Sequence, residues 1–134
     1  MSEDTKEEAH AGSFGLKLRF TSSGIERAEL ADLIVEAVRS TGVSIGNKRK
    51  FLIGHVKAFT SVPGGSLQVN LVDLDLGPEK DDRLPEGAIT NGEVRFMAAV
   101  VGLSDHELEE ILEGALEPLE ERLELDIEEH KHEH

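Results

Sequence analysis

The patterned part of the chain begins at residues 14–20, where apolar and polar residues alternate. Lys17 and Arg19 are the charged members, and the positions on either side of them are leucine or phenylalanine. Successive side chains of a β-strand point to opposite faces, so this alternation predicts a strand with one buried face. Residues 1–13 are polar and charged, and they are predicted to form a disordered acidic arm.

Residues 21–42 change to the spacing of an amphipathic helix, with apolar residues three and four positions apart. Ser23 and Glu26 are three residues apart, which predicts a capping box at the start of this helix. Gly42 follows the last apolar position and predicts the end of the helix.

Residues 51–76 are predicted to form two strands joined by a tight turn at Pro63-Gly64-Gly65. We expect Val62 to pair with Ser66 around a three-residue turn. In that register the apolar side chains lie on one face of the hairpin near the turn and on the opposite face farther from it. A bulge near Leu71 would explain the change within one chain, and contact with a second copy is the alternative.

Residues 92–102 alternate again and predict a further strand, and residues 103–123 predict the last helix. Ser104 and Glu107 are spaced as a second capping box. Pro118 should kink this helix or divide it, because proline lacks an amide donor and crowds the preceding turn.

The order of elements is therefore β-α-β-β-β-α, which predicts the α+β class. We expect a mostly antiparallel four-stranded sheet with two helices packed on one face. A chain of 134 residues fits one such domain. The domain is predicted to span residues 14–125, followed by an acidic, histidine-rich tail at residues 126–134.

Charge and composition exclude several classes of function. The chain has 28 acidic and 14 basic residues and a formal net charge of -14, which disfavours binding to nucleic acids and to anionic membranes. It has no cysteine, so disulfides and thiolate chemistry are excluded. The beginning lacks the apolar core of a secretory signal, and no apolar run reaches the roughly 20 residues that span a bilayer. We expect a cytoplasmic protein.

One internal polar cluster is a candidate catalytic site. In the expected hairpin register His55 faces Asp73, and Lys57 and Asp75 belong to the same face. A carboxylate beside an imidazole can fix its tautomer and raise its basicity, as in general bases. A cross-strand polar pair at the solvent-facing end of a sheet is the simpler explanation.

Residues 77–92 show no periodicity and are expected to form a long loop. Five carboxylates between Asp73 and Asp82 could supply oxygen ligands to calcium or magnesium, although their spacing does not match an EF-hand. A mobile acidic loop is the alternative interpretation.

The last five residues contain His130, His132 and His134. Imidazoles at this spacing can coordinate one nickel, zinc or copper ion together, so the tail is a candidate metal site. A polar terminus without any ligand is the alternative.

Together these observations predict a small binding or accessory protein that forms homo-oligomers. Its tail is predicted to bind a divalent transition metal, namely Ni, Zn or Cu. One alternative is a small enzyme with a site around His55 and Asp73 beneath the 77–92 loop. Another is a structural subunit that docks a protein partner. No dinucleotide-binding, Walker or zinc-protease motif is present in the sequence.

Overall fold

The computed structural model describes residues 11–48 and 54–132, with side chains described for residues 14–48 and 54–127. In chain order its elements are β1 (Ala11–Ile25), α2 (Arg27–Lys48), β2 (Gly54–Val62), β3 (Gly65–Leu71), β4 (Glu79–Arg83), β5 (Ile89–Val101), α3 (Asp105–Ala115), α4 (Glu117–Arg122) and β6 (Glu124–His132).

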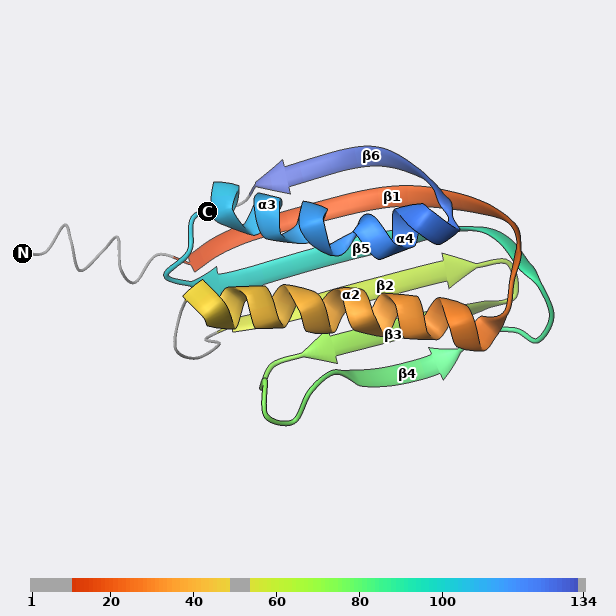
Figure 1. The fold of residues 1–134 in the computed structure, drawn as a ribbon, viewed down its shortest axis with the longest axis horizontal. Coiled ribbons are helices and arrows are strands. Elements are labelled where there is room, and N and C mark those ends of the chain that lie inside the picture. The colour runs from red at the N-terminus through yellow and green to blue at the C-terminus, as the bar shows by residue number, and fades with distance from the viewer. Residues whose placement is uncertain (1–10, 49–53, 133–134) are drawn as a thin grey trace, which may run out of the picture.

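The strands form one antiparallel sheet in the order β4-β3-β2-β5-β1-β6, and the three helices all cover the same face of it (Figure 1). This confirms the α+β class and the antiparallel sheet with helices on one face. The predicted number of four strands was wrong, because the sheet has six. None of the described helices is long and apolar enough to span a bilayer.

The core lies between the helices and the inward-facing side chains of the inner strands. On each of these strands every second residue is buried, as the alternation predicts. The largest side chains buried there are Phe14, Phe20 and Phe96.

The first missed strand, β4, lies within the segment predicted to be a loop. All five of its residues are charged, which local strand propensity disfavours. It forms because it pairs with β3, from Ser66–Arg83 to Asn70–Glu79. Among the described strands it lies at the edge, so one of its sides has no neighbour there, and a row of charges discourages pairing with other chains.

The second missed strand, β6, forms the opposite edge by pairing with β1. Its backbone runs from Glu124 to His132 and therefore crosses residue 126, where the tail was predicted to begin. Leu123, Leu125 and Ile127 alternate along the chain. The helix predicted for residues 103–123 included Leu123, which hid this alternation.

The hairpin register differs by one residue from the prediction. Val62 pairs with Gly65 rather than with Ser66, so the turn has two residues, Pro63 and Gly64. One face of the hairpin therefore remains buried from Val56 to Val62, and the change of side that suggested a bulge does not occur.

Both predicted ends of the first helix were wrong. The backbone of β1 continues to Ile25, and Ser22 rather than Ser23 stabilises this corner by accepting from the amide of Gly24 and donating to the carbonyl of Ile89. Helix α2 then continues through Gly42 to Lys48.

Gly42 is buried because α2 lies very close to β3. A Cβ atom at Gly42 would lie 2.2 Å from Cδ2 of Leu71 and 3.1 Å from Cδ2 of Leu74. One turn later, a Cβ at Gly46 would lie 2.8 Å from Cδ1 of Leu74. The two glycines therefore provide the space that these leucines fill.

The C-terminal helical region agrees with the prediction. Ser104 and Glu107 form the expected capping box, with bonds of 3.1 and 3.0 Å. The helix divides at Leu116 into α3 and α4, next to Pro118. Arg122 of α4 donates a hydrogen bond of 2.8 Å to Glu29 of α2, and this guanidinium lowers the pKa of the Glu29 carboxyl.

We predict that Gly42→Ala destabilises the protein by about 1–2 kcal/mol, because overpacking against the buried Leu71 outweighs the better helix propensity of alanine. Gly114→Ala in α3 is the matched control. A Cβ there meets nothing within 4 Å, so this variant should be more stable by about 0.5 kcal/mol. Urea unfolding measures the free energy of unfolding of both variants, and an equal change in the two would contradict the packing argument.

Candidate functional site

The four candidate catalytic residues lie on two segments of the chain. His55 and Lys57 lie on β2, whereas Asp73 and Asp75 lie in the turn that follows β3. The pairing between β2 and β3 ends at Val56–Leu71, so the described ladder contains no His55–Asp73 pair.

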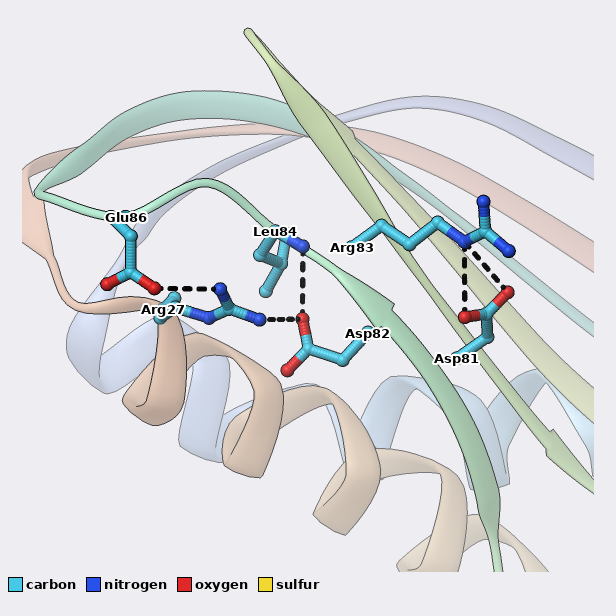
Figure 2. Close-up of polar contacts among 6 residues, drawn as sticks. All are labelled: Arg27, Asp81, Asp82, Arg83, Leu84 and Glu86. Carbon is cyan, nitrogen blue, oxygen red and sulfur yellow. Dashed lines mark hydrogen bonds and ion pairs between the residues drawn. The ribbon is translucent and has the colours of Figure 1, made fainter.

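Two carboxylates of the predicted acidic loop, those of Asp81 and Asp82, are engaged in other contacts (Figure 2). Asp82 accepts hydrogen bonds from Arg27 of α2 at 2.9 Å and from the amide of Leu84 at 3.0 Å. Asp81 accepts from the guanidinium of Arg83 at 3.2 Å. Among the described residues, no three His, Asp or Glu side chains converge as a metal site would require.

The predicted metal ligands of the tail fall outside the side chains that the structure describes. The backbone of His130 and of His132 belongs to β6, opposite Leu16 and Phe14 of β1. His134 lies beyond the described residues. Metal binding by these three histidines therefore stays a prediction.

The most distinctive surface is the face of the sheet that the helices leave uncovered. Each inner strand places its alternate residues there, and the cross-strand pairs set which of them are neighbours. Arg95 of β5 lies between Phe59 of β2 and Lys17 of β1, and Met97 lies opposite Lys57.

We call six of these residues the open-face patch. They are Lys17, Arg19, Lys57, Phe59, Arg95 and Met97.

The patch is cationic, although the chain as a whole has a net charge of -14. Its four cations come from β1, β2 and β5, and the only acidic residue on these three strands is Glu93. Glu93 forms ion pairs with Lys17 at 3.5 Å and with Arg95 at 3.4 Å. Lys57 makes no ion pair with any part of the described chain and is exposed. The six patch residues therefore include four cations and no acid, while Asp126 of the neighbouring strand β6 lies opposite Arg19.

Two large apolar side chains lie within this cationic surface. Phe59 is 44% exposed and Met97 is 51% exposed. They are diagonal neighbours on adjacent strands, because Phe59 lies opposite Arg95 while Met97 lies opposite Lys57. A single exposed apolar residue is ordinary, but an adjacent pair in the middle of an uncovered sheet is suited to contact with another molecule.

Sequence reasoning found part of this patch and missed the rest. The alternation in residues 14–20 correctly puts Lys17 and Arg19 on the polar face of their strand. The predicted pairing of Val62 with Ser66 would place Phe59 opposite Val69 on an apolar face, because that register was wrong by one residue. The correct two-residue turn at Pro63-Gly64 would have placed Phe59 among polar residues.

Shallow hollows lie at one end of the sheet, around Thr21. One has a volume of about 540 Å³, and its lining includes Arg19, Ser61 and Asn91. It does not include His55 or Asp73, so it adds nothing to the predicted catalytic cluster. Comparison of the chain with family models, with curated proteins and with solved structures found no match.

Proposed function

We propose that the protein is a small cytoplasmic binding or accessory module that self-associates through the uncovered face of its sheet. The observation that carries this proposal is the exposed pair of Phe59 and Met97 in the open-face patch. Apolar residues on the opposite face are covered by helices, whereas these two have no covering element within the described chain. Covering them with protein would remove apolar surface from water.

The geometry supports binding better than catalysis. An enzyme site at His55 and Asp73 was inferred from their pairing across the hairpin, and the described ladder contains no such pair. The residues expected to cover that site as a loop instead form β4 and the start of β5. The enzyme alternative therefore gains no support from the arrangement of these residues.

We predict that the double variant Phe59→Ser with Met97→Ser weakens self-association by about tenfold or more, because two apolar contacts are lost. Light scattering across a range of concentrations measures the average molar mass, from which the strength of self-association follows. Ile127→Ser is the control, since Ile127 is 40% exposed but lies on the edge strand β6 outside the patch. A wild-type protein that stays monomeric at every concentration would defeat the proposal.

A second proposed function is binding of nickel, zinc or copper by His130, His132 and His134, supported by their concentration in the last five residues. The test should replace these histidines rather than remove the tail. Truncation at residue 128 would delete backbone that pairs with β1 as far as His132.

We predict that replacing the three histidines by asparagine abolishes measurable binding of nickel or zinc in calorimetric titration, because no imidazole ligands remain in the tail. The control replaces His55 and His106 by asparagine, which removes imidazoles elsewhere in the chain. Equal affinity of the tail variant and the wild type would exclude the tail as the site.

A further inference from the structure

We propose that the turn at residues 72–76 of one copy docks on the open-face patch of a second copy. The inference rests on the proposed self-association and names the two surfaces that meet. We call residues 72–76 the acidic turn. Its sequence is Val-Asp-Leu-Asp-Leu, in which apolar and acidic residues alternate.

The acidic turn has a defined shape because its middle residue is anchored on α2. Leu74 packs where Gly42 and Gly46 leave space on the helix. An oxygen of the Asp73 carboxylate accepts from the amide of Asp75 at 2.8 Å, and the carbonyl of Asp73 accepts from the amide of Gly77 at 2.9 Å. A surface that is ordered before binding loses less conformational entropy when it binds.

The side chains around this anchor are exposed to solvent. Val72 is 61% exposed and Leu76 is 75% exposed, which makes Leu76 the most exposed of the large apolar residues that the structure describes. Asp73 and Asp75 are also exposed. The acidic turn thus presents two apolar side chains and two carboxylates.

The open-face patch offers the complementary chemistry. Phe59 and Met97 can cover the apolar side chains of the turn, and Lys57 and Arg95 can pair with its carboxylates. Such charge complementarity fixes orientation and favours encounter, while the apolar contacts supply most of the affinity.

The acidic turn cannot reach the patch of its own chain. Leu74 holds the turn against α2, which lies on the covered face of the sheet, whereas the patch lies on the opposite face (Figure 1). The contact must therefore form between copies.

The charges also favour this contact over a symmetric one. A two-fold contact centred on the patch would place the cations of one copy against the same cations of the other, which costs free energy. A turn-to-patch contact is heterologous, because each copy uses a different surface. Its repetition gives a ring or an open chain of copies.

Mixing two defective variants tests the inference. The patch variant carries Phe59→Ser and Met97→Ser, and the turn variant carries Asp73→Asn, Asp75→Asn and Leu76→Ser. Asparagine at position 73 retains the oxygen that accepts from the amide of Asp75, so the turn keeps its hydrogen bond.

In sedimentation velocity, each variant alone should be monomeric at concentrations where the wild type associates. An equimolar mixture should form a heterodimer and nothing larger, because it contains one working turn and one working patch for each pair. A control variant with Glu36→Gln and Glu113→Gln loses two exposed helix carboxylates and should associate like the wild type.

The possible outcomes separate the two proposals. If the turn variant alone associates like the wild type while the patch variant does not, the patch binds itself or another segment, and only the turn inference is overturned. A mixture that stays monomeric also overturns the turn inference. If the wild type itself is monomeric at every concentration, the proposed self-association is overturned, and the turn inference is overturned with it.

Discussion

The close packing of α2 on β3 determines the arrangement of the rest of the molecule. Gly42 and Gly46, one helical turn apart, let α2 approach β3 so closely that Leu71 and Leu74 fill the space beside them. This contact holds α2 over β2 and β3, and it also holds the segment after β3 against the helix. The described helices consequently cover one face of the sheet only, and no other described element lies over the second face, which can meet solvent or another molecule.

The distribution of charge follows from this one-sided covering. Side chains on the helix-covered face are mostly apolar, because burying a polar group costs free energy, and Asp82 is retained near it through its contact with Arg27. The uncovered face has no such restriction, and its inner strands collect four cations around Glu93. Meanwhile most acidic residues lie on helices, turns and edge strands. An acidic protein can therefore contain a local cationic surface without a change in its net charge.

The sequence predicted the elements whose stability is local or whose burial has a clear period. The capping box at Ser104 is an example, since both of its hydrogen bonds lie within four residues. Strand β4 was missed because its five charged residues depend on pairing with β3 and on the Arg27–Asp82 contact, which joins residues far apart in the chain. Gly42 was misread because glycine marks a helix end and a close helix contact equally well. The open-face patch depends on strand order, which no local pattern encodes.

The position of β1 in the sheet has a consequence for how the chain folds during synthesis. The first strand lies between β5 and β6, the last two strands to be made. Both of its edges therefore lack partners until residue 89 and then residue 124 have left the ribosome. The hairpin of β2 and β3 can form early from local contacts, but the pairings of β1 form only after β5 and β6 have been made. Until then the apolar side chains Phe14, Leu16, Leu18 and Phe20 lack the strands that flank them in the folded sheet, which makes this segment suited to chaperone binding.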